Sequence, residues 1–374
     1  MKVLIVTIVD NINYGTYLQA FATWWTIKQM GHEPIILDYE RPYISPINVS
    51  KQYLHDKTKG FFSKIVYAAV YPLLFNYMKW NVKRFLKQRA ILTKKYCNIK
   101  KIVGEQINAD IYLTGSDQVW NSDYNKGIDK IFFLDFAKNG FKCSFSSSVG
   151  INSFSENDIP VIKNLLLQYD RISVRESFGV EVLKNIGIGN IEQLVDPTFL
   201  LTKSVWLSMC ATNSFVKKEP YLLIYSVEKD RTNTILKIAK EIAEYKQLKT
   251  YWVCPTIKFR KKLGVDRVYC LANVETFLNL VANADFMIVS SFHGTAFSIN
   301  FNKQFITVSP SKYNSRVMSL LNLVGLKDRY IEGDQFVFEN FKDIEYDKIN
   351  PILEQQRTKA TTYLTNIFKG NHHE

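Results

Sequence analysis

Cysteine is scarce in this chain, and its spacing fits no familiar site. The 374 residues include only five Cys, an odd number without a CxxC pair. No Cys and His residues stand at the spacing that holds structural zinc. Neither a disulfide framework nor a zinc-stabilised fold is therefore expected, and a reducing compartment is the simplest setting.

Glycine, proline and long apolar runs are also in short supply. Sixteen Gly and ten Pro are too few for a collagen-like or low-complexity protein. No run of about 20 uninterrupted apolar residues is present, so no segment is expected to span a bilayer. The opening MKVLIVTIVD resembles a signal peptide, but the run ends at Asp10 and Asn11 without a small-residue cleavage site. A buried strand is the better interpretation.

Positive charge is abundant but confined to one region. Residues 51–101 hold 13 Lys or Arg against a single acid, Asp56, so +12 of the net charge of +13 lies there. The same region contains ten aromatic residues. One interpretation is a pair of surface helices, apolar toward the core and basic toward solvent. The other is a surface that docks on anionic lipid. Nucleic acid is not an expected partner, because no recognition motif accompanies the charge.

Apolar strand patterns and helix patterns alternate along most of the chain. Residues 3–9 form a β-branched run, 14–30 are helix-like, and 34–39 form a second strand. The same alternation continues to a last predicted helix at 347–369. It predicts an α/β fold with mostly parallel sheets, and the length suggests two domains.

Four polar clusters begin where predicted strands end. They are residues 10–15 (DNINYG), 115–121 (GSDQVWN), 175–176 (RE) and 290–295 (SSFHGT). Because open parallel sheets bind ligands at the carboxyl edge of their strands, the clusters predict a shared cleft.

His293 is the leading candidate for proton transfer. It follows the strand FMIVS and precedes Gly294 and Thr295, which open a helix whose positive end attracts an anion. That end disfavours the imidazolium, so the ring is expected to stay neutral until an anionic ligand binds. The alternative is a histidine that merely caps a helix.

Two arginines could complete an anion site. Arg175 ends a short strand and could instead be solvated or paired with Glu176, whereas Arg316 stands near a helix start. Planar guanidinium groups bind phosphate and carboxylate through paired hydrogen bonds. With His293, they suit a small substrate that carries both groups.

The first two polar clusters offer groups for a sugar. Asp117 could hydrogen-bond hydroxyls and Trp120 could stack on a ring, although Trp120 could equally be a core residue. Gly15 and Gln19 are expected at the same opening. The candidate acceptor-binding residues are Asp10, Asn13, Tyr14, Gly15, Gln19, Ser116, Asp117 and Trp120.

Several ordered blocks of sequence resemble the polysaccharide pyruvyl transferases. The blocks are NYGTYLQAFATWWTIKQMGHEPIILDY, LTGSDQVWN, ISVRESFGVEVLKNIG with VDPTFLL, and SSFHGTAFSINFNKQFITV. The resemblance implies two Rossmann-like lobes similar to GT-B glycosyltransferases. It also implies phosphoenolpyruvate as donor and a sugar diol as acceptor, within a growing polysaccharide or a polyprenyl-diphosphate-linked precursor, at the cytoplasmic face of a bacterial membrane.

The resemblance also assigns roles to residues. The family's histidine falls on His293, its arginine on Arg175, and a following basic residue on Arg316, with Lys303 and Lys312 as neighbouring alternatives. We expect His293, Arg175 and Asp117 to be catalytic. The expected donor-binding residues are Arg175, Ser291, His293, Gly294, Thr295 and Arg316. Neither a metal nor a bound cofactor is expected.

The expected domains follow the same blocks. Residues 1–170 would form an acceptor-side lobe with a basic, aromatic helical insertion at about 44–102. Residues 171–345 would form the donor-binding lobe, and 346–374 a helix that packs back on the first lobe.

Two other functions remain open from the sequence. A nucleotide-sugar glycosyltransferase could use the same two-lobed fold, since fold does not fix function. A membrane-surface adaptor would explain the basic region, but it would leave the four polar clusters without a purpose.

Overall fold

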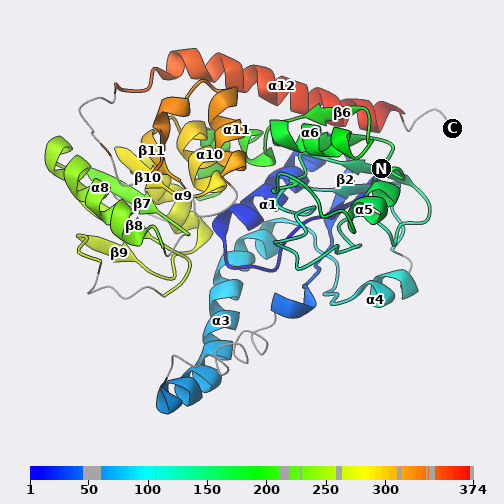
Figure 1. The fold of residues 1–374 in the computed structure, drawn as a ribbon, viewed down its shortest axis with the longest axis horizontal. Helices are drawn as coiled ribbons and strands as arrows, with labels where there is room; N and C mark the ends of the chain where they lie inside the picture. Colours follow the sequence, from blue (N-terminus) through cyan, green and yellow to red (C-terminus); the bar gives the residue numbers. More distant parts are fainter. Residues whose placement is uncertain are drawn as a thin grey trace.

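The computed structural model shows two α/β lobes side by side, with one long helix projecting below them (Figure 1). It describes residues 1–44, 60–105, 107–210, 219–227, 230–257, 263–309, 314–333, 336 and 342–370, and the side chains of 61–69 are not described.

The first lobe is built on a parallel sheet with the strand order β2-β1-β3-β4. Its strands are β1 (Lys2–Val6), β2 (Glu33–Ile36), β3 (Ile111–Thr114) and β4 (Phe141–Ser144). Strands β1 and β3 are apolar on both faces because helices and loops cover both sides of the sheet. Helix α1 (Tyr14–Gln29) follows β1 and is buried along most of its length.

The first lobe extends beyond the boundary that we expected near residue 170. Strands β5 (Ile172–Val174) and β6 (Ile191–Gln193) pair in parallel, and β5 continues the first sheet through bridges from Cys143 to Arg171 and from Ser147 to Val174. Helices α5 (Ile159–Leu166) and α6 (Ser177–Asn185) pack in this lobe's core. Strand pairing and shared burial therefore place residues 172–193 with the first lobe.

The second lobe contains a six-stranded parallel sheet with the order β12-β11-β10-β7-β8-β9. The strands are β7 (Tyr221–Tyr225), β8 (Lys249–Val253), β9 (Arg267–Tyr269), β10 (Phe286–Val289), β11 (Gln304–Val308) and β12 (Tyr330–Ile331). The helices are α7 (Lys203–Ser208), α8 (Thr232–Lys246), α9 (Val274–Asn283), α10 (Phe292–Asn300) and α11 (Ser315–Leu323). The predicted fold class, two lobes with parallel sheets, is confirmed.

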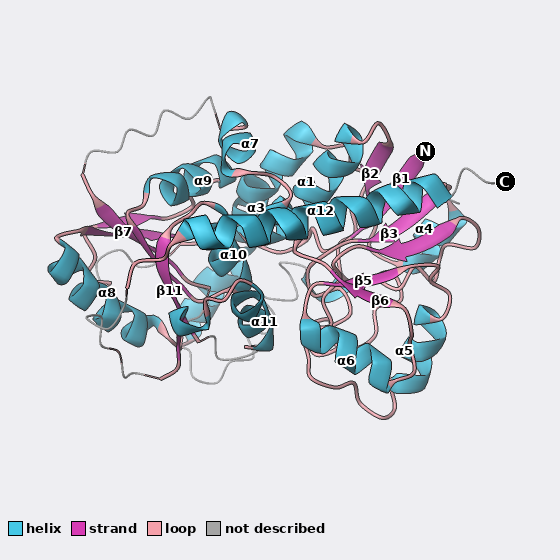
Figure 2. Ribbon diagram, turned by 90° about the horizontal axis from the view of Figure 1, so that it is seen from above, coloured by secondary structure: helices cyan, strands magenta, loops and turns pink. Residues whose placement is uncertain are grey.

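Helix α12 (Tyr346–Gly370) runs from the second lobe across to the first (Figure 2). The hydroxyl of Tyr363 donates to the carbonyl of Ser144 at 2.9 Å, and its ring stacks on Phe145 with centroids 6.3 Å apart. The C-terminal helix thus packs on the first lobe and fastens the two lobes together.

The basic region forms helix α3 (Phe61–Arg89) and the short helix α4 (Ile99–Gly104). Two α3 lysines point inward, where Lys79 pairs with Glu40 and Lys83 pairs with Asp38. We expected a helix with apolar side chains toward the core and cations toward solvent. The structure differs, because these two cations also face the body of the protein. None of the helices in the described ranges is long and apolar enough to cross a bilayer.

Candidate functional site

A cavity of about 210 Å³ lies between the lobes, at the carboxyl ends of their strands. Its lining combines the loop after β1, the loop after β3 and the start of α10. The lining residues are Asn11, Asn13, Thr16, Asp117, Gln118, Tyr124, Val227, Ser290, Ser291, Phe292, His293, Arg316 and Val317. Three of the four predicted polar clusters therefore share one opening, and Arg316 joins them.

His293 lies in the first turn of α10, where the helix begins at the end of β10. The Ser291 side chain caps the helix by accepting a hydrogen bond from the Gly294 N–H at 3.1 Å. The imidazole packs against α1 at Gly15, where an added Cβ would lie only 2.1 Å from the ring's Cγ. Gly15 is therefore needed so that the two lobes can approach closely at the histidine.

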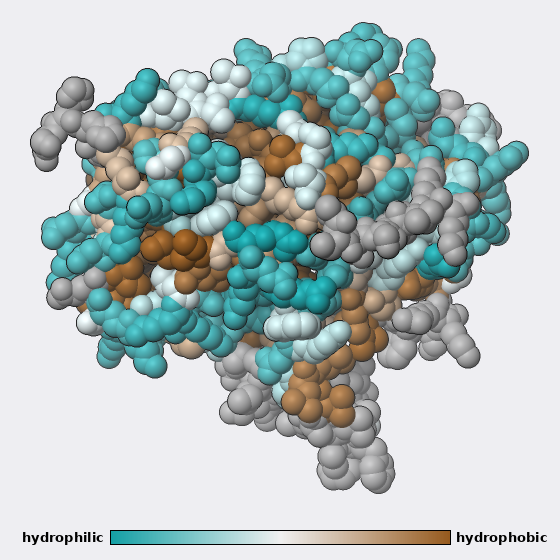
Figure 3. Space-filling model, turned by 180° about the vertical axis from the view of Figure 1, so that it is seen from behind, coloured by the Kyte–Doolittle hydropathy of each residue, from teal (hydrophilic) through white to brown (hydrophobic). Residues whose placement is uncertain are grey.

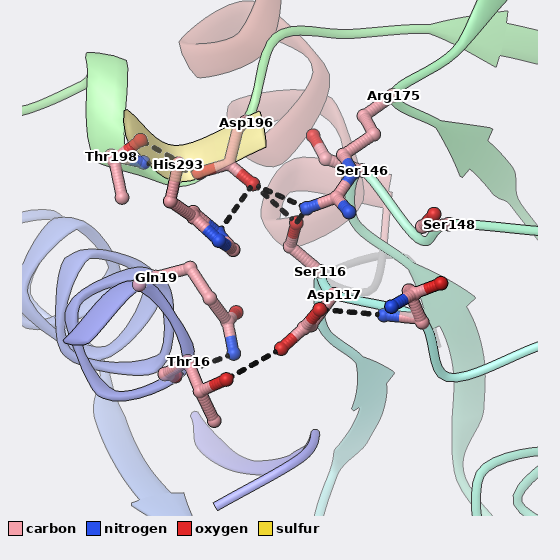
Figure 4. A network of polar contacts seen from close by, with 12 residues as sticks. Thr16, Gln19, Ser116, Asp117, Ser146, Ser148, Arg175, Asp196, Thr198 and His293 are labelled. Atoms are coloured by element: carbon pink, nitrogen blue, oxygen red, sulfur yellow. Dashed lines mark hydrogen bonds and ion pairs between the residues drawn. The ribbon is translucent and has the colours of Figure 1, made fainter. Parts of the chain in front are cut away.

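Asp196 is the centre of the polar network beneath the cavity (Figure 4). Its Oδ2 accepts from Ser116 Oγ at 2.7 Å and from Arg175 Nη1 at 2.9 Å, and lies 3.8 Å from His293 Nε2. Its Oδ1 accepts from the N–H and hydroxyl of Thr198, in the 3₁₀ turn η2 (Pro197–Phe199). Asp196 thus joins the predicted histidine to the predicted arginine.

Arg175 is placed behind the cavity wall. Its side chain is 0% exposed and its guanidinium is ion-paired with Glu176 at 3.0 Å and with Asp196. The guanidinium also stacks on the ring of Phe292 at 4.0 Å, and Phe292 lines the cavity. Two carboxylates and an aromatic ring surround the charge of Arg175, which does not line the cavity, whereas its Nη2 makes no hydrogen bond within the described residues.

Asp117 faces the cavity from the first lobe. Its backbone has a φ of 70°, an uncommon conformation for a residue other than glycine. The carboxylate accepts from Thr16 Oγ1 at 2.9 Å and from the Gln118 N–H at 2.9 Å. These contacts hold Asp117 in one orientation beside the opening.

The charged groups of the site shift one another's pKa values. Burial lowers the pKa of His293 below its ordinary value, and the carboxylates of Asp196 and Asp117 oppose this only in part. Burial would raise the pKa of each of these carboxylates, but attraction to the imidazolium form of His293 and to the Arg175 guanidinium outweighs it, so both pKa values lie below the ordinary value. The site at neutral pH thus contains two carboxylates and a neutral imidazole.

Arg316 extends from the first turn of α11 to the cavity and is half-buried. Burial, with the neighbouring charge of Arg175, lowers its pKa to about 10, so it remains a cation at neutral pH. Of the two alternatives, Lys303 lies elsewhere, because its ammonium donates to the carbonyls of Ala282 and Ala284 at the end of α9. Lys312 lies outside the described residues.

Three of the expected acceptor-binding residues make their contacts within the protein core and do not line the cavity. Asp10 is held by the Arg41 guanidinium, at 2.7 and 2.9 Å. Tyr14 stacks on Phe277 and donates to the carbonyl of Ala272, and it does not line the cavity. Trp120 is 1% exposed and its Nε1 donates to the carbonyl of Phe132, so stacking on a sugar is excluded in this position.

The other predicted site residues divide between the cavity and the layer behind it. Asn13 and Ser291 line the cavity. Four more are buried and contribute from behind: Gly15, Gln19, Ser116 and Thr295. Gly294 lies under the helix start, where an added Cβ would come within 2.9 Å of Val289.

Sequence reasoning did not single out several residues that shape the site. Asp196 stands in VDPT, and an Asp followed by Pro and Thr is a capping pattern that could have drawn attention to it. Thr16 and Tyr124, which line the cavity, carry no comparable signal. Within the described ranges, no group of His, Cys, Asp or Glu is arranged to hold a metal ion.

Solved structures with a similar fold include UDP-GlcNAc 2-epimerases. The enzyme from Methanocaldococcus jannaschii is 13% identical with a TM-score of 0.51, over 95% of this chain and 92% of that one. The enzyme from Rickettsia bellii is 9% identical with a TM-score of 0.52, over 100% and 97%. At this identity the likeness shows the fold alone. No curated protein matches the sequence.

A comparison with protein families gives a match of a different kind. The model of the polysaccharide pyruvyl transferase family matches residues 13–312, which include every residue that lines the cavity except Asn11, Arg316 and Val317. The chain therefore belongs to the polysaccharide pyruvyl transferase family.

Proposed function

We propose that this protein transfers a pyruvyl group from phosphoenolpyruvate to two hydroxyls of a sugar, forming a pyruvate ketal and releasing phosphate. One observation carries the proposal beyond family membership. A neutral histidine, a carboxylate and an arginine face one small cavity, contributed by His293, Asp117 and Arg316 from both lobes. A donor with a phosphate and a carboxylate needs a positive group such as Arg316. An acceptor with hydroxyls needs a hydrogen-bond acceptor such as Asp117, and proton transfer needs a neutral base such as His293.

The donor is assigned to the second-lobe side of the cavity. Arg316 offers a guanidinium to the phosphate or the carboxylate, and the positive end of α10 at Ser291 offers a second attraction for an anion. Arg175 acts indirectly, because its guanidinium holds the Phe292 ring and the Asp196 carboxylate in place. It is therefore a positioning residue in this mechanism.

The acceptor is assigned to the first-lobe side. Asp117 stays ionised and can accept a hydrogen bond from a sugar hydroxyl, and Asn11, Asn13 and Tyr124 offer polar groups around it. The Asn11 amide donates to the Tyr124 hydroxyl at 3.0 Å, so these two side chains form one polar wall.

The proposed chemistry balances without an additional reactant. The methylene carbon of phosphoenolpyruvate gains a proton, one hydroxyl attacks C2, the C2–O bond to phosphate breaks, and the second hydroxyl closes the ketal. The two protons lost from the hydroxyls supply the new C–H bond and the proton on the released phosphate. His293 is the candidate for moving these protons, because its lowered pKa leaves the imidazole neutral at pH 7 and therefore able to accept a proton. It also lies on the donor side of the cavity.

The setting that we propose is bacterial surface-glycan synthesis at the cytoplasmic face of the membrane. A sugar on a polyprenyl diphosphate, or on a growing polysaccharide, would be the acceptor. No bound cofactor is proposed.

Donor binding gives the direct test. Phosphoenolpyruvate should raise the melting temperature by mass action, whereas UDP should not. Incubation with phosphoenolpyruvate and a panel of lipid-linked sugars should then release phosphate and add the mass of a pyruvyl ketal to one of them. Stabilisation by UDP alone would favour the glycosyltransferase alternative and overturn the proposal.

A further inference from the structure

Helix α3 carries an exposed apolar stripe along one side. The stripe consists of Val70, Leu73, Tyr77 and Trp80, which are 53%, 74%, 49% and 52% exposed. Spacings of three and four residues put all four on the same helix face, and the rings of Tyr77 and Trp80 lie 5.9 Å apart. Large apolar side chains gathered in this way on a surface indicate an interaction site.

The opposite face of α3 already has its partners. Phe75, Val82 and Phe85 are buried against the body, and Phe85 packs edge-on against Phe21 of α1 with centroids 5.2 Å apart. Arg89, at the C-terminal end, pairs with Glu275 of α9 at 3.1 Å. The helix is thus anchored at its C-terminal half and projects from the lobes at its N-terminal half (Figure 1).

Two cations continue the stripe toward the body. Arg84 and Lys87 follow Trp80 at the same spacing, and the Arg84 guanidinium lies 5.5 Å from the centre of the Trp80 ring. Neither cation pairs with an acid in the described ranges, in contrast to Lys79 and Lys83 on the other sides of the helix. The stripe therefore ends in positive charge that is available to a partner.

We propose that this stripe, residues 70, 73, 77, 80, 84 and 87 of α3, docks the protein on an anionic lipid surface. Tryptophan and tyrosine favour the boundary between lipid and water, leucine and valine favour the acyl region, and Arg84 and Lys87 attract anionic headgroups. Residues of high hydropathy are visible on the projecting part of the surface when the molecule is seen from behind (Figure 3).

Charge favours a lipid surface over a second copy of the chain. Residues 51–101 carry a net charge of +12, of which acids of the body neutralise a part at Lys79, Lys83 and Arg89. The stripe itself keeps Arg84 and Lys87, so two copies of it repel each other when brought together. An anionic surface is attracted by the same charge. The inference goes beyond the proposed reaction, because it depends neither on the donor nor on the acceptor.

Vesicle co-sedimentation of the full chain without any substrate tests the docking surface. Wild type should bind vesicles of phosphatidylcholine mixed with phosphatidylglycerol and should bind pure phosphatidylcholine far less, with high salt weakening the binding. Leu73→Ser with Trp80→Ser should weaken it by about tenfold or more, because apolar burial drives the insertion. Arg84→Gln with Lys87→Gln should weaken it mainly at low salt.

Matched substitutions elsewhere supply the controls. Leu167→Ser with Tyr245→Ser removes two apolar side chains that are also exposed, at 61% and 63%, and should leave vesicle binding unchanged. Equal binding by the α3 variants and wild type would overturn the proposal. So would a wild-type dimer in sedimentation velocity that dissociates in the Leu73→Ser, Trp80→Ser variant while no vesicle binding is seen, since the stripe would then be a contact between copies.

Discussion

Gly15 of α1 and His293 of α10 pack against each other so closely that no further carbon atom fits between them. A Cβ at position 15 would lie 2.1 Å from Cγ and 2.2 Å from Nδ1 of the imidazole. The first lobe therefore positions the candidate acid and base of the second lobe. This contact ties the approach of the two lobes to the chemistry that we propose.

Gly15→Ala should displace the histidine. Overpacking of this kind costs about 1–3 kcal/mol, so we expect a modestly lower melting temperature and the loss of most phosphate release from phosphoenolpyruvate. Gly189→Ala is the matched control, because a Cβ there meets nothing within 4 Å. Full activity of the Gly15→Ala variant would show that the close contact has no catalytic importance.

His293→Ala should remove turnover while the fold is retained. General acid–base catalysis contributes about 10²- to 10⁴-fold, and the loss of phosphate release should be of that size. His32→Ala is the control, because His32 packs on Phe368 in α12, away from the cavity. Near-normal product formation by the His293→Ala variant would defeat the assignment.

Stability should fall as the pH drops below neutral, in part through His293. Burial lowers its pKa in the folded protein, whereas the unfolded chain takes up this proton near pH 6.5. The unfolded state holds more protons just below that pH, so the free energy of unfolding decreases there. Urea denaturation between about pH 7 and about pH 5 should show a shallower decline for His293→Gln than for wild type. Parallel curves would mean that the histidine is not buried in its neutral form.

Asp196→Asn should reduce both stability and activity. Of its two acidic partners in the described residues, Arg175 would keep only Glu176, and breaking a buried ion pair costs up to about 3–5 kcal/mol. The imidazole of His293 would also lose the carboxylate beside its Nε2. Thr198→Ser, which keeps the hydroxyl that donates to Asp196, should be tolerated. If denaturation and phosphate release were both normal in Asp196→Asn, the network would not have the role that we assign to it.

Arg316→Ala should weaken the binding of phosphoenolpyruvate. Its guanidinium reaches the cavity, so we expect a higher KM for the donor and a smaller rise of the melting temperature on adding it, with partial recovery in Arg316→Lys. Lys303→Ala is the control that distinguishes a loss of donor binding from simple destabilisation of the fold. It removes two hydrogen bonds to carbonyls at the end of α9, so it should lower the melting temperature but leave the donor-induced rise intact.

The regular part of the fold was predictable because it follows from local patterns. The predicted helix at 14–30 corresponds to α1 at Tyr14–Gln29, and the predicted strand before His293 corresponds to β10 at Phe286–Val289. Polar residues after such strands predicted the opening between the lobes, where Asp117 and His293 do meet.

The partners of the charged residues were not predictable from local patterns. Arg175 and Asp196 are 21 residues apart, and Asp10 and Arg41 are 31 apart, yet each pair is buried in direct contact. Which charges face the cavity and which neutralise one another depends on packing between distant segments. Trp120 shows the same limit, because a tryptophan next to a site can equally be part of the core.

The sequence alone determined the class of fold, the family and the edge of the sheets at which a ligand would bind, because apolar periodicity and ordered motifs are local properties of the chain. Only the tertiary structure decided that Arg175 supports the wall of the cavity while Arg316 faces it, and that Gly15 holds His293 in place. It also revealed the exposed face of α3. Burial and charge pairing are properties of segments brought together by folding, so no single stretch of sequence contains them.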